Sequence, residues 1–108
     1  MKIISVEEAA RLGGTLASGY FDPLLASHAA RLAELKRDGV PLIVLIATSE
    51  DSILPAQARA ELIAGLRVVD YVVASVEGLT PHVRLELEDV MRREKLIEHV
   101  HTRQQAAS

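Results

Sequence analysis

The pattern of apolar and polar positions predicts strands and helices that alternate along the chain. Residues 15–18, Thr-Leu-Ala-Ser, form a short stretch of apolar and small hydroxyl side chains without charge, and residues 40–47 form a longer, apolar one that is mainly β-branched and leucine side chains. Such runs are typical of parallel strands that are covered on both faces. Between them, residues 26–36 carry apolar side chains at the spacing of an amphipathic helix.

Segments on either side fit the same scheme. Residues 5–8 read Ser-Val-Glu-Glu, a capping-box pattern, so we expect a short helix that ends near residue 12, before two glycines. Pro55 fits the first turn of a helix over residues 56–66. Residues 68–74 are again mainly apolar and predict a third strand.

The pattern after residue 74 supports two interpretations. Residues 82–88 alternate between polar and apolar side chains, which predicts an edge strand with one solvent-facing side. Thr80-Pro81 also fits the start of a helix. Residues 89–105 are expected to be helical.

Strands and helices in this order predict a small three-layer α/β/α sandwich of the Rossmann-like class, with right-handed crossovers and a parallel sheet of about four strands. We expect a single domain over residues 1–108, with an N-terminal helix within residues 1–13 and a C-terminal helix over 89–105.

Composition narrows the possible functions. The formal net charge is −3 and no run is rich in Lys or Arg, which argues against nucleic acid as a partner. The chain has no cysteine, as is compatible with a reducing cytoplasm, the expected location. No apolar run approaches the ~20 residues that span a bilayer, so no membrane partner is expected.

Candidate chemistry is concentrated between residues 15 and 28, where a strand, a tight turn and a helix start follow one another. Gly19 and the Asp22-Pro23 pair mark the turn, although Asp22 is also an ordinary turn residue. The free N–H groups and the dipole of a helix N-terminus stabilise an anion, so this order of elements suits a phosphate.

Two segments carry a family resemblance. Residues 19–28, Gly-Tyr-Phe-Asp-Pro-Leu-Leu-Ala-Ser-His, resemble the G-x-F-D-x-x-H-x-G-H signature loop of the cytidylyltransferase-like nucleotidyltransferases. Residues 59–73 are similar to the R-A-E-x-L-x-A-L-x-x-V-D-Y-V-V segment of the same family. Within this family, the segments resemble those of glycerol-3-phosphate cytidylyltransferases and of the nucleotidyltransferase domain of ADP-heptose synthases.

The resemblance implies a nucleotide triphosphate site, with Mg²⁺ accompanying the nucleotide and no metal site made by the protein alone. It assigns the catalytic role to His28. The nucleotide-binding residues that it implies are Ser18, Gly19, Tyr20, Phe21, Asp22, Leu25, His28, Thr48 and Arg59. Purely structural roles stay open for His28, as a helix-start residue, and for Arg59, as an ion-pair partner.

Three departures from the family pattern affect the chemistry. Leu25 and Ser27 replace the first His (or Thr) and the Gly of the signature, and the loop over residues 49–54 is short and lacks the family's lysine. The late R-T-x-G-I-S-T-T type motif is not found. Since the loss of one placed donor typically removes ~3–4 kcal/mol of transition-state stabilisation, we expect nucleotidyl transfer to be lost or weak.

The leading hypothesis is therefore a degenerate nucleotidyltransferase-like domain that binds a nucleotide or a phosphorylated small molecule, or serves in regulation or assembly. One alternative is a minimal active cytidylyl- or adenylyltransferase that uses His28. Another is a structural homodimer module without a ligand; a homodimer is also the expected assembly of this family.

Overall fold

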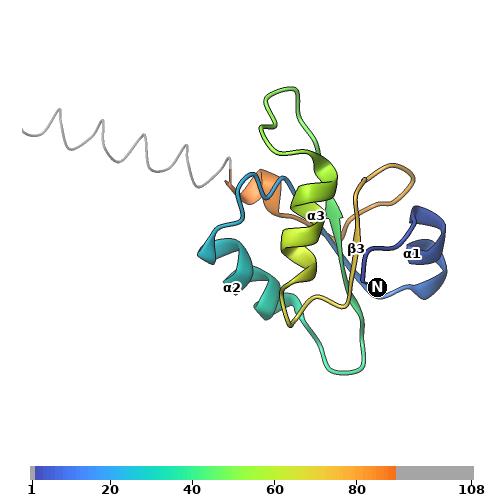
Figure 1. Cartoon of the computed structure of the whole chain (residues 1–108). Helices are drawn as coiled ribbons and strands as arrows, with labels where there is room; N and C mark the ends of the chain where they lie inside the picture. The colour runs from blue at the N-terminus through green and yellow to red at the C-terminus, as the bar shows by residue number, and fades with distance from the viewer. Residues whose placement is uncertain (1, 90–108) are drawn as a thin grey trace, which may run out of the picture.

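The structure is a computed structural model that describes residues 2–89 (Figure 1). Its centre is a parallel sheet of four strands in the order β3-β2-β1-β4. The strands are β1 (Thr15–Gly19), β2 (Leu42–Ile46), β3 (Tyr71–Val73) and β4 (Val83–Arg84); the helices are α1 (Val6–Leu12), α2 (Ala26–Leu35) and α3 (Ala56–Ala64). This confirms the predicted small Rossmann-like α/β fold.

The central strand β2 is buried along its whole length and separates two apolar clusters. Leu42, Val44 and Ile46 face one side, where α2 and α3 pack; Ile43 and Leu45 face the other, where α1 packs. Figure 1 shows α2 and α3 on one side of the sheet and α1 on the other. The continuous apolar run that predicted a central strand is thus explained by two covered faces.

Local signals position the first helix and the third strand. Ser5 Oγ accepts a hydrogen bond from the Glu8 N–H at 3.2 Å, so the predicted cap of α1 is confirmed. Asp70 precedes β3, and its Oδ2 accepts from Lys36 Nζ and from the Leu42 N–H, each at 2.7 Å. The Lys36 ammonium first, and then the Leu42 amide, hold the pKa of the Asp70 carboxyl below its ordinary value.

Several predicted boundaries were wrong by a few residues. The third strand is limited to Tyr71–Val73, and α3 ends at Ala64 rather than at residue 66. Pro55 lies just before α3, at its N-cap, because its extended backbone with ψ 149° is not helical.

The largest correction concerns residues 82–88. Only Val83–Arg84 pair with β1, and the chain is helical from Leu85 to Asp89. Leu85 is buried in the cluster that includes α2 and α3, so one core contact was mistaken for a repeating strand pattern. The expected helix over residues 89–105 lies outside the described residues apart from Asp89. None of the helices within residues 2–89 has the length and apolar character needed to span a bilayer.

Candidate functional site

The carboxyl ends of all four strands lie at one edge of the sheet, because the sheet is parallel. The chain passes from β1 to β2 and β3 in one direction and then returns to β4 on the other side of β1. A reversal of strand order of this kind leaves a crevice beyond the strand ends, where α/β proteins bind ligands. The residues predicted to bind a nucleotide surround this edge.

The first turn after β1 is built on contact between Gly19 and the ring of Phe21. Phe21 has a positive φ of 50° and is 1% exposed, so its ring folds back into the core. A Cβ on Gly19 would lie 2.6 Å from that ring, which leaves room for glycine alone. The ring also packs nearly at a right angle against the His28 imidazole, with 5.4 Å between ring centroids. Gly19 and Phe21 therefore determine the shape of the loop, and Phe21 is a core residue.

Arg59 is completely buried and joins the ends of β1 and β2 to the start of α3. Its Nη1 donates to the carbonyls of Tyr20 at 2.9 Å and Ala47 at 2.6 Å. Its Nε donates to the Leu54 carbonyl and its Nη2 to Thr48 Oγ1, both at 3.0 Å. Since a guanidinium has five N–H donors, these four bonds leave one donor for another partner. Arg59 thus has a structural role, but through hydrogen bonds to backbone carbonyls and a hydroxyl rather than through the ion pair that the sequence left as an alternative.

Asp22 holds the loop over residues 49–54 against the turn after β1. Its carboxylate accepts hydrogen bonds from the backbone N–H groups of Ile53 and Leu54. These bonds, first that of Ile53 and then that of Leu54, lower the pKa of Asp22 from its ordinary value, and the nearby charge of Arg59 lowers it further. Asp22 and Arg59 together fix the two loops that border the crevice.

His28 lies in the first turn of α2 and is 6% exposed. Its Nδ1 accepts a hydrogen bond from the Leu25 N–H at 3.1 Å, which satisfies one of the free donors of the helix start. Its Nε2 lies 2.7 Å from Asp89 Oδ2. Because Nδ1 is an acceptor in this geometry, the ring proton belongs on Nε2 and is donated to Asp89.

Acidic residues that follow β4 contact this region, and sequence analysis missed them. Ser18, which is fully buried near the end of β1, donates its hydroxyl to Glu86, with distances of 2.8 and 2.9 Å to the two carboxylate oxygens. Asp89 accepts from His28, and Glu88 accepts from Arg31 Nε at 2.9 Å. The polar positions of the supposed edge strand were the available signal, but they were interpreted as solvent-facing.

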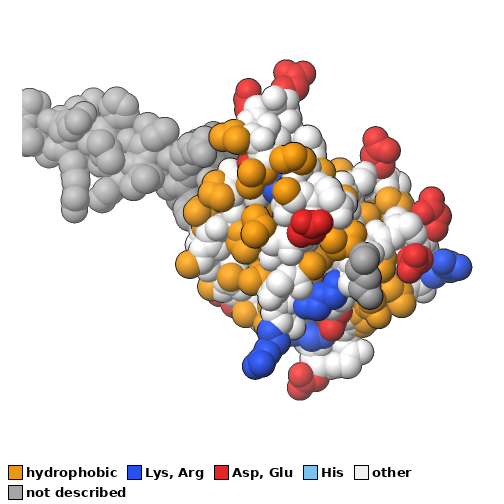
Figure 2. All heavy atoms as spheres, viewed as in Figure 1, with side chains coloured by type: hydrophobic (Ala, Val, Ile, Leu, Met, Phe, Trp, Pro, Cys, Tyr) orange, Lys and Arg blue, Asp and Glu red, His pale blue; other side chains and the backbone are white. Residues whose placement is uncertain are grey.

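The other predicted residues are more open to solvent. Leu25 is 51% exposed at the N-cap of α2, so it does not plug the crevice. Tyr20 is 36% exposed, and Thr48 is exposed beside Arg59. Glu50 and Asp51 are exposed as well, and Figure 2 shows acidic side chains at the tip of the loop that follows β2.

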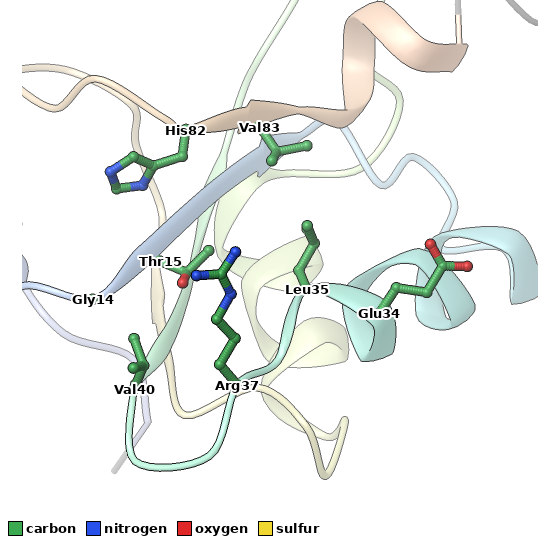
Figure 3. Close-up of a pocket in the computed structure, with 8 residues that line it drawn as sticks. All are labelled: Gly14, Thr15, Glu34, Leu35, Arg37, Val40, His82 and Val83. Carbon is green, nitrogen blue, oxygen red and sulfur yellow. The ribbon is translucent and has the colours of Figure 1, made fainter.

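A pocket of about 390 Å³ lies at the opposite edge of the sheet (Figure 3). Its lining comes from the amino ends of β1 and β4, from the last turn of α2 and from the segment that follows α2: Gly14, Thr15, Glu34, Leu35, Arg37, Val40, His82 and Val83. None of these is a residue predicted to bind a nucleotide. The pocket is therefore separate from the candidate site at the carboxyl edge.

The carboxylates near the crevice do not fit a magnesium site. Asp22 accepts two backbone hydrogen bonds, Glu86 accepts from Ser18, and Asp89 accepts from His28. Within residues 2–89, the structure contains no group of three or more Asp, Glu or His side chains that could hold a metal ion. These three carboxylates are thus engaged by donors of the protein and are not arranged around a cation.

A comparison of the chain with protein families, with curated proteins and with solved structures found no match in any of the three. The contacts of the described residues are therefore the structural evidence from which a function is proposed.

Proposed function

We propose that this chain is a nucleotidyltransferase-like domain in which the phosphate cradle is retained in part and nucleotidyl transfer is lost or weak. It acts as a phosphate- or nucleotide-binding module with a regulatory or assembly role. By the cradle we mean the end of β1 with Ser18, the turn that follows, and the start of α2 with His28. The observation that supports the proposal most directly is that carboxylates of this same chain accept hydrogen bonds from Ser18 and His28.

What remains of the cradle is the start of α2. Among the described residues, the N–H groups of Ala26 and Ser27 donate no hydrogen bond, and the first turn contains no acidic side chain. Unpaired N–H groups at the positive end of a helix favour an oxyanion. The turn through Gly19 and Phe21, in which the Phe21 ring packs against Gly19 and against His28 of α2, brings this helix start close to the end of β1.

What transfer requires is a set of donors directed at the phosphates that become more negative in the transition state. Leu25 offers no side-chain donor. The one N–H of the His28 ring in this geometry, on Nε2, already donates to Asp89. Each missing donor typically lowers the rate by about 10²–10³. A carboxylate beside the developing negative charge opposes the reaction further, because like charges repel.

The test is an assay of pyrophosphate release. The full chain is incubated with CTP or ATP, Mg²⁺ and a panel of alcohol and sugar phosphates, with His28→Ala as the matched control. We expect no release above that control with any pair. Multiple turnovers by the wild-type chain that His28→Ala abolishes would contradict the proposal and support a minimal active transferase.

A structural homodimer is the second candidate, and the exposed apolar side chains favour it. Leu62 of α3 is 50% exposed and Ile53 is 85% exposed. Figure 2 shows hydrophobic side chains across the side of the molecule formed by α2 and α3. Sedimentation equilibrium measures the mass, and calorimetric titration with CTP and ATP separates the roles: a dimer with no binding heat would favour this candidate.

A further inference from the structure

The segment after β4 carries the carboxylates that contact Ser18 and His28, and the strand register explains how it reaches them. Ser18 pairs with Arg84 in the register between β1 and β4, so the residues that follow β4 emerge directly beside the end of β1. The chain then becomes helical at once, and Leu85, 2% exposed, anchors this turn in the core. Glu86 and Asp89 are thereby brought against the cradle.

We infer that residues 85–89 form an autoinhibitory strap, in which Glu86 and Asp89 occupy the hydrogen-bonding atoms that a phosphate ligand would use. This inference rests on the proposed function, since the cradle is the site that the strap closes. Carboxylates and phosphates are both oxyanions that accept hydrogen bonds from hydroxyl and imidazole groups. The carboxylates of the strap thus occupy the positions in which a phosphate would accept the same hydrogen bonds.

Burial makes the competition direct. Ser18 is 0% exposed and His28 is 6% exposed, so neither side chain is accessible to a solute while the strap is in place. Glu86 contacts the Ser18 hydroxyl through both of its oxygens, and Asp89 contacts His28 Nε2 at 2.7 Å. An incoming phosphate must displace these carboxylates, or lie beside them and meet like charge.

The neighbouring acid Glu88 provides a matched control. It belongs to the same turn, but its partner is Arg31, which also pairs with Glu34 on the surface of α2. The side chains of Arg31 and Glu88 are 33% and 32% exposed. Removal of the Glu88 charge therefore changes the net charge of the strap without opening the contacts to Ser18 or His28.

The test measures anion affinity by calorimetry at low ionic strength, with inorganic pyrophosphate and with CTP as ligands. The double variant Glu86→Gln/Asp89→Asn keeps the side-chain shapes and removes both charges. We expect it to bind each ligand at least about tenfold more tightly than the wild-type chain, because like-charge juxtaposition is relieved. Glu88→Gln should bind with the wild-type affinity.

Equal affinities of the double variant and the wild-type chain would overturn the strap, and so would an equal gain in Glu88→Gln, which would indicate a general charge effect. Should the double variant fail to fold, hydrogen exchange of the wild-type chain gives the decision. Excess pyrophosphate should accelerate exchange of the amides in residues 85–89, and unchanged exchange would overturn the inference. Pyrophosphate release by the wild-type chain would instead contradict the proposed function, whatever the affinities of the variants.

Discussion

Replacement of Arg59 by methionine tests whether the buried guanidinium holds the two loops at the crevice. Methionine fills much of the same volume but donates no hydrogen bond. The change would leave the carbonyls of Tyr20, Ala47 and Leu54 without their present donor. The fourth hydrogen bond of Arg59, to Thr48 Oγ1, would also be lost.

The expected cost follows from these four bonds. A hydrogen bond to a charged group contributes about 1.5–3 kcal/mol, but the desolvation of a buried charge offsets part of the sum. Arg59 is fully buried and so is its hydrogen bond to the Ala47 carbonyl, so water does not replace that bond without a shift of the loops. We expect Arg59→Met to lower the free energy of unfolding by about 3–5 kcal/mol, a large share of the 5–15 kcal/mol typical of a small domain.

The assay is urea unfolding followed by far-ultraviolet circular dichroism, because the chain has no tryptophan. Arg59→Lys is the matched control: it keeps the charge and some of the donors, so its loss should be smaller than that of Arg59→Met. A decrease of less than about 1 kcal/mol in Arg59→Met would refute the reasoning, since it would show that desolvation of the charge offsets all four bonds.

Two further predictions concern packing and charge. Gly19→Ala should destabilise the chain by about 1–3 kcal/mol in the same urea assay, because its Cβ would lie 2.6 Å from the Phe21 ring. Gly65→Ala should change stability by less than about 1 kcal/mol, since Gly65 has a helical φ of −74°; equal losses would contradict the packing argument. The pKa of Asp70 is lowered by Lys36 and the Leu42 amide, so its ionised form stabilises the folded chain. This contribution is complete above the ordinary aspartate pKa and is lost as the pH falls through the lower pKa of the folded chain. In Asp70→Asn, the free energy of unfolding should therefore fall less steeply at acid pH, on the acid limb of its pH dependence. An unchanged acid limb would count against the ion pair.

The fold could be predicted from the sequence because its signals are local. The apolar run over residues 40–47 has no polar position, and this predicted a strand covered on both faces; β2 is such a strand. The cap at Ser5 and the helical spacing after residue 26 likewise depend on neighbours in sequence. The order of these elements then left few possible topologies for a parallel sheet.

The contacts of the site could not be predicted, because their partners are far apart in sequence. Ser18 and Glu86 are 68 positions apart, and His28 and Asp89 are 61 positions apart. The sequence places Ser18 and His28 near the loop but carries no information on which side chains face them. Their assignment as nucleotide-binding residues stays a prediction.

The error at residues 82–88 has the same origin. An alternation of polar and apolar side chains over seven residues fits a half-buried strand. The acidic side chains at the polar positions, however, contact Ser18 and Arg31 of other elements instead of facing solvent as on an edge strand. Leu87 is 52% exposed, whereas Leu85 is buried, so the two leucines do not share one covered face. Likewise, a helix pattern that counts only apolar side chains overlooks Arg59, which is buried through its hydrogen bonds.

The central claim is that a carboxylate of this chain holds the cradle histidine, and long-range proton–nitrogen NMR spectra of the imidazole rings at neutral pH test it most directly. His28→Gln identifies the His28 signals among those of the four histidines. We predict a proton on Nε2 that exchanges slowly and an Nδ1 that accepts from the Leu25 amide. The Nε2 proton should exchange faster in Asp89→Ala, which removes its acceptor. A proton on Nδ1, or Nε2 proton exchange that does not change in Asp89→Ala, would contradict the claim.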